Sequence, residues 1–153
     1  MTEPALPMPT EIAKGALLTG VLNAVINGAI QAWLLAGSGP LPLTVDGIAN
    51  DAHTVFGAAV PLAVSLAMIL TAVAYLAVKH RKPPFYPTFL WMTVKHGFFA
   101  LGVIVTFAVL FQRIFGSISV SSWAAVVILG LVAGVVAAIV NYMTIRASVD
   151  AAR

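Results

Sequence analysis

Four polar side chains recur at every fourth position in a long apolar stretch near the beginning of the chain: Thr19, Asn23, Asn27 and Gln31. Residues four apart lie on one face of a helix, so the spacing predicts a continuous polar face. A carboxamide inside a hydrocarbon layer is costly unless it finds hydrogen-bond partners. We therefore expect this face to point at another helix, another subunit or water.

Two interpretations of this polar face are open. Neutral amides form hydrogen bonds between membrane helices worth about 0.6–2 kcal/mol each, which favours a helix contact. The same side chains suit the lining of a binding cavity or a permeation path. The contact is the simpler interpretation, because Asn and Gln carry no charge.

A stripe of small residues runs beside the polar face. Its members are Ala16, Gly20, Ala24, Gly28, Ala32 and Ala36, and a second stripe near the end of the chain contains Gly130, Gly134 and Ala138. Small residues four apart let two helix backbones approach closely. We predict close helix packing through Gly20, Gly28, Gly130 and Gly134, either within one chain or between neighbouring chains.

Lys95 and His96 are an adjacent ionisable pair about seven residues into the third apolar stretch. A lysine stem can carry its ammonium back to the membrane surface. Alternatively, this lysine and the basic loop before it attract anionic lipid headgroups or an anionic substrate. The residues considered for such contacts are Lys79, Arg81, Lys82, Lys95 and His96.

Groups suited to catalysis or to metal and cofactor binding are scarce. The chain has no cysteine, which excludes thiolate chemistry, and its apolar stretches contain neither paired aspartates nor HExxH. No two histidines are expected to face each other at membrane depth, which disfavours haem. Asp46, Asp51 and His53 share one loop, where Asp51 is more simply a helix cap than a cation ligand or acid–base group. We expect no enzyme, no metal and no cofactor.

The composition identifies the elements that position these residues. Of 153 residues, 61% are hydrophobic and 8% are charged, whereas soluble domains are about a quarter charged. A soluble fold of this length cannot bury so much apolar surface, and intrinsic disorder requires the opposite composition. Nucleic-acid binding requires a basic face that the chain does not offer. An integral membrane protein remains.

Four stretches are long enough to cross a hydrocarbon core of about 30 Å as helices. They cover residues 12–36, 54–78, 88–115 and 122–145. The prediction is an all-α, four-helix membrane bundle forming a single domain over residues 1–153, with antiparallel neighbouring helices and the first helix at its centre. Residues 1–11 form a Pro-rich segment and residues 37–53 an outer loop. Pro61 is expected to bend the second helix.

The distribution of basic residues predicts the orientation. One side of the membrane is assigned Lys14, Lys79, Arg81, Lys82, Lys95, Arg146 and Arg153, and the other side Arg113 alone. Because short cytoplasmic loops are rich in Lys and Arg, both termini should be cytoplasmic, in a bacterial inner membrane.

These features predict a small non-enzymatic accessory subunit or helix-docking scaffold that self-associates or joins a larger membrane complex. The alternative is an oligomeric pore or carrier for a small neutral or anionic solute, lined by the polar face. The expected partners are the bilayer, anionic headgroups on the cytoplasmic side, and a second copy or other membrane subunits. No nucleic acid is expected.

Overall fold

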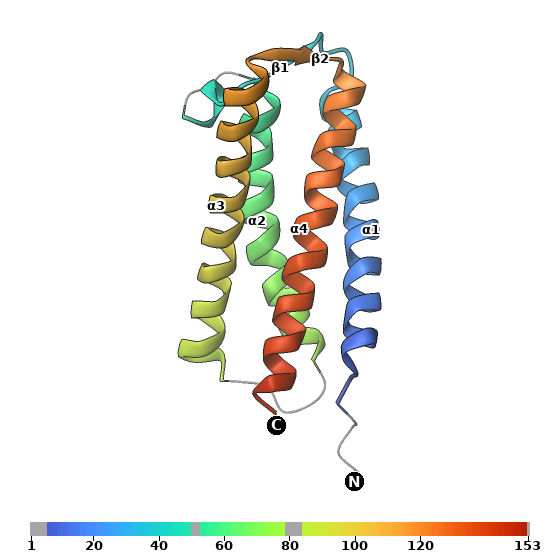
Figure 1. The fold of residues 1–153 in the computed structure, drawn as a ribbon. Helices are drawn as coiled ribbons and strands as arrows, with labels where there is room; N and C mark the ends of the chain where they lie inside the picture. Colours follow the sequence, from blue (N-terminus) through green and yellow to red (C-terminus); the bar gives the residue numbers. More distant parts are fainter. Residues whose placement is uncertain (1–5, 50–52, 79–83, 153) are drawn as a thin grey trace.

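Four long helices dominate the computed structural model, which describes residues 6–49, 53–78 and 84–152. These helices are α1 (Pro9–Leu34), α2 (Val55–Ala77), α3 (Leu90–Phe115) and α4 (Ser122–Asp150). They run side by side along one axis, and the start of α1 and the end of α4 lie at the same end of the bundle (Figure 1). We call this the terminal end. The predicted all-α four-helix fold is confirmed.

Each helix is long and apolar enough to cross a membrane. The least hydropathic candidate span is Pro9–Leu34 and the most hydropathic is Ser122–Asp150. The chain is thus a multi-pass membrane protein with four candidate spans.

Local sequence determines where the helices begin. In α1, Pro9 occupies the first turn, where its missing N–H is not needed, and the Met8 N–H donates to the Glu11 carboxylate at 2.8 Å. The Thr54 hydroxyl accepts from the Gly57 N–H at 2.9 Å and caps α2. Ser121 caps α4 in the same way. Asp51, the expected cap of α2, lies outside the described residues.

The far end of α4 differs from the prediction. The helix continues five residues beyond the predicted end, to Asp150. Two contacts at i,i+4 spacing support this extension: Arg146 donates to the Tyr142 hydroxyl at 3.1 Å and lies 3.7 Å from the Asp150 carboxylate. Such pairs stabilise a helix beyond its apolar section.

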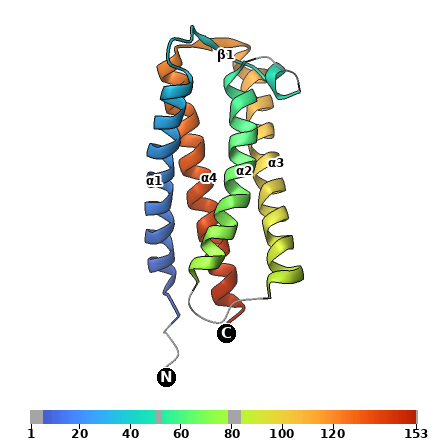
Figure 2. The ribbon, with the colours of Figure 1, turned by 180° about the vertical axis from the view of Figure 1, so that it is seen from behind.

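The centre of the bundle is formed by α4 together with α2, not by α1. The α1·α4 contact is the most extensive one, α4 also packs against α2, and α2 packs against α3. Figure 2 shows the bundle from behind, with α1 and α2 on either side of α4. Our expectation of a central first helix is therefore wrong. Alanines and glycines recur along the buried face of α4, whereas α1 exposes Leu17, Val25 and Trp33.

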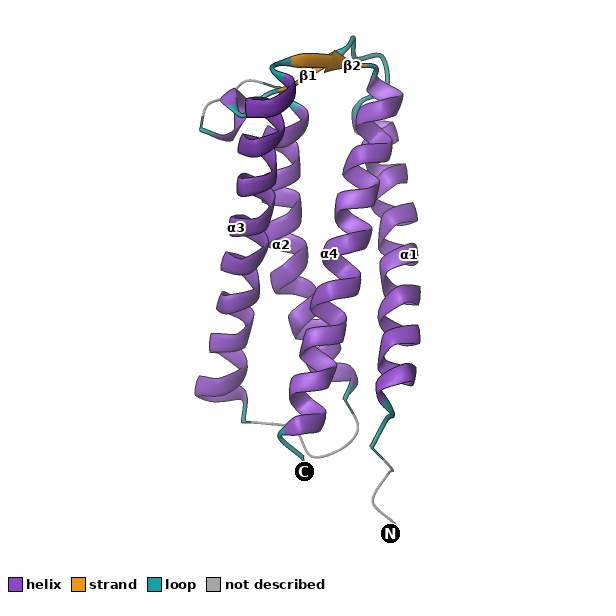
Figure 3. Ribbon diagram, in the orientation of Figure 1, coloured by secondary structure: helices purple, strands orange, loops and turns teal. Residues whose placement is uncertain are grey.

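The opposite end of the bundle carries a feature that the sequence did not predict (Figure 3). There, β1 (Leu41–Leu43) pairs antiparallel with β2 (Ile118–Val120), and Leu41 lies opposite Val120. We call this the strand end. A short helical turn, η1 (Asp46–Ile48), follows β1. The Val45 N–H donates to the Gln112 side chain of α3 at 2.6 Å, which fastens the loop to the bundle.

Pro61 lies on an exposed face of α2, which continues through it from Val55 to Ala77. The Ser65 hydroxyl donates to the Pro61 carbonyl at 2.7 Å. Opposite this face, Ala59, Ala63 and Ala67 are fully buried. A further helical turn, η2 (Phe85–Phe89), precedes α3.

Candidate functional site

The contact between α1 and α4 is built from glycines on both helices. A Cβ added to Gly20 would lie 2.8 Å from the Gly134 carbonyl oxygen, and one added to Gly134 would lie 2.8 Å from the Ala24 Cβ. One added to Gly130 would lie 3.1 Å from the Ala24 carbonyl oxygen, whereas Gly28 has only Gly130 at 4.0 Å. The two backbones therefore touch at these positions, as small residues permit in membranes.

The polar face of α1 lies beside this glycine contact and is half-buried. Three of its four side chains bond back to their own helix: Thr19 donates to the Gly15 carbonyl at 2.9 Å, Asn23 to the Thr19 carbonyl at 2.9 Å, and Asn27 to the Asn23 carbonyl at 3.0 Å. The carboxamide oxygens of Asn23 and Asn27 accept no hydrogen bond from the part of the chain that is described. One N–H donor and the whole carbonyl oxygen of each amide are thus unused among the described residues.

The stripe that contains the polar face extends toward the strand end of α1. Leu35 follows Gln31 by four residues and so continues the same stripe. It lines a pocket of about 790 Å³ together with Thr54 and Ala58 of α2 and with His53. The stripe therefore leads along α1 to a pocket at the strand end.

A second polar group lies on α4. The Oδ1 atom of Asn141 is buried and has no hydrogen-bond partner among the described residues. Asn141 follows Gly134 by seven residues, or about two turns, so it lies on the face that packs against α1. Buried polar atoms normally have hydrogen-bond partners. The contact between α1 and α4 therefore leaves one buried acceptor without a donor among the described residues.

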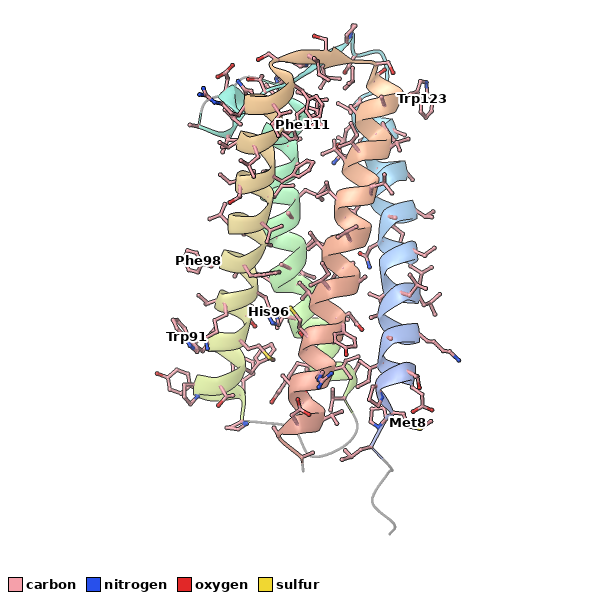
Figure 4. The ribbon with its side chains drawn as sticks, in the orientation of Figure 1. Met8, Trp91, His96, Phe98, Phe111 and Trp123 are labelled. Carbon is pink, nitrogen blue, oxygen red and sulfur yellow. The ribbon has the colours of Figure 1, made fainter. Side chains whose placement is uncertain are left out.

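The third site is a buried histidine near the terminal end. His96 of α3 is 6% exposed, and it points from α3 into the bundle (Figure 4). Its Nδ1 lies 2.8 Å from the Thr71 hydroxyl of α2 and 3.5 Å from the Thr144 hydroxyl of α4. The Thr144 carbonyl in turn accepts from the Ser148 hydroxyl at 3.0 Å. Three helices thus meet in one polar cluster.

The hydrogen bonds of Thr71 determine the tautomer of His96. The Thr71 hydroxyl donates its only proton to the Ala67 carbonyl at 2.7 Å. Its oxygen must therefore accept from His96, so Nδ1 carries the proton and Nε2 is left as an acceptor. Nε2 has no hydrogen-bond partner within the described ranges.

Lys95 lies next to this cluster but faces outward. It is exposed, and its Nζ lies 5.6 Å from the centre of the Trp91 ring, within reach of a cation–π interaction. Lys95, His96 and Trp91 line the same open groove, of about 620 Å³. Lys79, Arg81 and Lys82, the other residues considered for headgroup contacts, lie outside the described residues.

The described part of the loop between α1 and α2 contains Asp46 and His53. The Asp46 carboxylate accepts from the Thr44 hydroxyl at 2.7 Å, while His53 faces the pocket at the strand end. Within residues 6–49, 53–78 and 84–152, no group of three His, Cys, Asp or Glu residues is placed to hold a metal ion.

Sequence reasoning missed the partners of His96 and the orphan atom of Asn141. A signal for the first existed: Thr71, His96, Thr144 and Ser148 all lie in the terminal-end half of their helices, and the last two are four residues apart. Thr71, His96 and the pair Thr144 and Ser148 lie on three different helices, so no periodic pattern within one helix links them. Their convergence is visible only in the packed bundle.

In comparisons with known proteins, no family model, no curated protein and no solved structure matches this chain.

Proposed function

We propose that the protein is a non-catalytic membrane subunit that self-associates through the polar face of α1. The observation that supports this most is the pair of half-buried carboxamides of Asn23 and Asn27, near the middle of an apolar helix, with unused oxygens. Amide oxygens at such a depth gain from a donor on a neighbouring helix. The rest of α1 outside its contact with α4 exposes large apolar side chains that suit lipid.

A second copy of the chain is the partner that best fits this face. Two copies inserted in the same direction can be related by a two-fold axis along the membrane normal, and each residue near the axis then meets its own counterpart at the same depth. A carboxamide has both donors and acceptors. Asn23 can therefore pair with Asn23 of the other copy, and Asn27 with Asn27.

The orientation and the membrane belong to the same proposal. The basic residues at the terminal end support cytoplasmic termini, as in the inner membrane of a bacterium. The proposal that the protein is not an enzyme rests on the few reactive groups inside the spans, where His96 is bonded to hydroxyls and forms no hydrogen bond with a carboxylate of the described residues.

A pore or carrier for a small neutral or anionic solute is the second candidate. It is favoured by the continuity between the polar face and the strand-end pocket of about 790 Å³, which His53 and Thr54 line. In the dimer, the two polar faces would lie along one shared path. Solute flux into proteoliposomes that disappears on Asn23→Leu with Asn27→Leu would favour this candidate over the subunit.

Disulfide crosslinking tests the self-association. The chain has no cysteine, so Asn23→Cys introduces a single thiol on the polar face. Val25→Cys is the matched control, because Val25 lies at nearly the same depth on a different, exposed face of α1. We expect oxidation in liposomes to give a covalent dimer from Asn23→Cys and little from Val25→Cys. Equal crosslinking of both variants, or of neither, would contradict the proposal.

Dissociation of the dimer gives an independent measurement. The double variant Asn23→Leu with Asn27→Leu removes both amide pairs, each worth about 0.6–2 kcal/mol. We expect the dissociation constant, measured by native mass spectrometry in mild detergent, to rise at least about tenfold. A wild-type protein that is monomeric at every concentration would refute the proposal.

A further inference from the structure

An apolar groove separates α3 from α4 along their middle sections. These two helices make few direct contacts, and the space between them forms a groove of about 380 Å³ lined by apolar side chains. Phe99, Val103 and Phe107 line it from α3, and Val135 and Ile139 line it from α4.

At the terminal end, the apolar groove runs into the polar groove beside His96. The two share Phe99, and Met143 of the polar groove follows Ile139 of the apolar groove by one turn of α4. Lys95, Trp91 and His96, whose Nε2 has no hydrogen-bond partner among the described residues, line the polar section. The combined groove thus has a cationic, hydrogen-bonding head and an apolar tail.

The length of the combined groove matches one leaflet of a bilayer. From Lys95 to Phe107, the twelve steps of α3 at 1.5 Å each span about 18 Å. Half of a hydrocarbon core of about 30 Å is a similar length. Trp91 and Lys95 suit the headgroup level, where aromatic and basic side chains gather.

We propose that this combined groove, the α3–α4 groove, binds a lipid with an anionic, hydroxyl-bearing headgroup and lodges one of its acyl chains between the helices. The Lys95 ammonium attracts the headgroup phosphate. Nε2 of His96 accepts a hydrogen bond from a headgroup hydroxyl, because the Thr71 hydroxyl already uses Nδ1–H. The apolar section between Phe99 and Phe107 takes the chain. Phosphatidylglycerol has this chemistry.

This site is independent of the proposed dimer. The residues of α4 that line the groove, such as Val135 and Ile139, are not those that contact α1, such as Gly130 and Gly134. A monomeric protein can therefore still bind the lipid, and the two proposals can fail separately.

Competition between lipids tests the headgroup. The full-length protein is extracted from vesicles holding equal amounts of phosphatidylglycerol and phosphatidylcholine with the same chains, and retained lipids are counted by native mass spectrometry. We expect phosphatidylglycerol to be preferred about 25-fold: about fivefold from one basic residue near an anionic headgroup and about fivefold from the hydrogen bond of the headgroup hydroxyl. Lys95→Gln should lower the preference about fivefold, and the matched variant Lys14→Gln should keep it. Equal retention of both lipids, or equal effects of the two variants, would overturn the proposal.

Two further probes separate the parts of the ligand. Phosphatidylmethanol carries the same charge without the hydroxyl, and we expect its retention to be about fivefold lower than that of phosphatidylglycerol, as for one lost hydrogen bond. Equal retention would overturn the role of His96. Inorganic phosphate should not displace the lipid, because it cannot fill the apolar section. Displacement by phosphate would show a simple anion site and overturn the proposal.

The apolar section is tested by filling it. Val135→Phe places a ring at the groove, and Val127→Phe places the same ring at a position on α4 that does not line it. The two valines are 57% and 58% exposed, so the variants disturb the fold equally little. We expect Val135→Phe to lower phosphatidylglycerol retention at least about threefold and Val127→Phe to leave it unchanged. An equal effect of both variants would overturn the assignment of the acyl chain.

Discussion

His96 joins three helices through one ring nitrogen. Thr71 of α2 receives its Nδ1–H, and Thr144 of α4 lies at the edge of hydrogen-bond distance from the same atom. A buried donor that loses its acceptor costs about 1–3 kcal/mol. The single hydroxyl of Thr71 therefore holds the ring of His96 in one tautomer and one orientation.

Removal of that hydroxyl is a test at the scale of one atom. We expect Thr71→Val, which keeps the shape, to lower the free energy of unfolding by about 1–3 kcal/mol, measured by denaturing-detergent titration from mild micelles. Ser65→Ala is the control, because the Ser65 hydroxyl bonds only to backbone carbonyls of its own helix and lies on an exposed face. Equal losses for the two variants would contradict the role assigned to Thr71.

The residue types revealed part of the candidate site in advance. Polar residues four apart on α1 were visible as one face, because helix periodicity is a local property. The direction in which the amides of Asn23 and Asn27 bond was not visible, since a neighbouring helix and their own backbone offer the same acceptor. Asn141 was missed because it lies among the polar residues at the end of the last apolar stretch, where an amide at the membrane surface needs no partner in the protein.

The presence or absence of single Cβ atoms determines how closely α1 and α4 approach each other. On α1, Gly20 touches the backbone of α4, whereas Gly15 has nothing within 4 Å of its would-be Cβ. We expect Gly20→Ala to lower the free energy of unfolding by about 1–3 kcal/mol through overpacking. Gly15→Ala should be neutral or stabilising by up to about 1 kcal/mol, because alanine is the better helix former.

The measurement is the same detergent titration, made on both variants. The contact with α4 requires a loss of stability for Gly20→Ala and none for Gly15→Ala. A loss of stability at Gly15 as large as that at Gly20 would show that the change acts through the helix and not through its contact with α4.

Among the elements of the fold, the sequence predicted those that hydropathy and length alone determine. All four helices were found, since each needs only its own apolar residues to be recognised. The pairing of β1 with β2 was not found, because three-residue strands from two distant loops leave no periodic pattern. The central position of α4 was also missed, because small-residue stripes occur on both α1 and α4 and do not say which has a second partner.

The orientation of the whole molecule is a prediction that single cysteines can test. In intact cells, an impermeant maleimide should label Ser117→Cys at the strand end and should not label Ala151→Cys at the terminal end. Both positions are exposed in the structure. After the cells are broken, both should react, which controls for the reactivity of the thiols. The reverse pattern in intact cells would show that the termini lie outside and would contradict the positive-inside assignment.

The contact of the first helix with the last has a consequence for how the protein is made. Translation delivers α1 to the membrane before its main partner, helix α4, because α2 and α3 are synthesised between them. Until then α1 must remain in lipid without the neighbour that later covers its glycines. The amides of Asn23 and Asn27 each donate one hydrogen bond to a carbonyl of their own helix. These bonds lower the free-energy cost of keeping both amides in lipid before α4 arrives. Truncation before α4 should therefore leave an inserted but unpaired first helix, exposed to membrane quality-control proteases for as long as synthesis is incomplete.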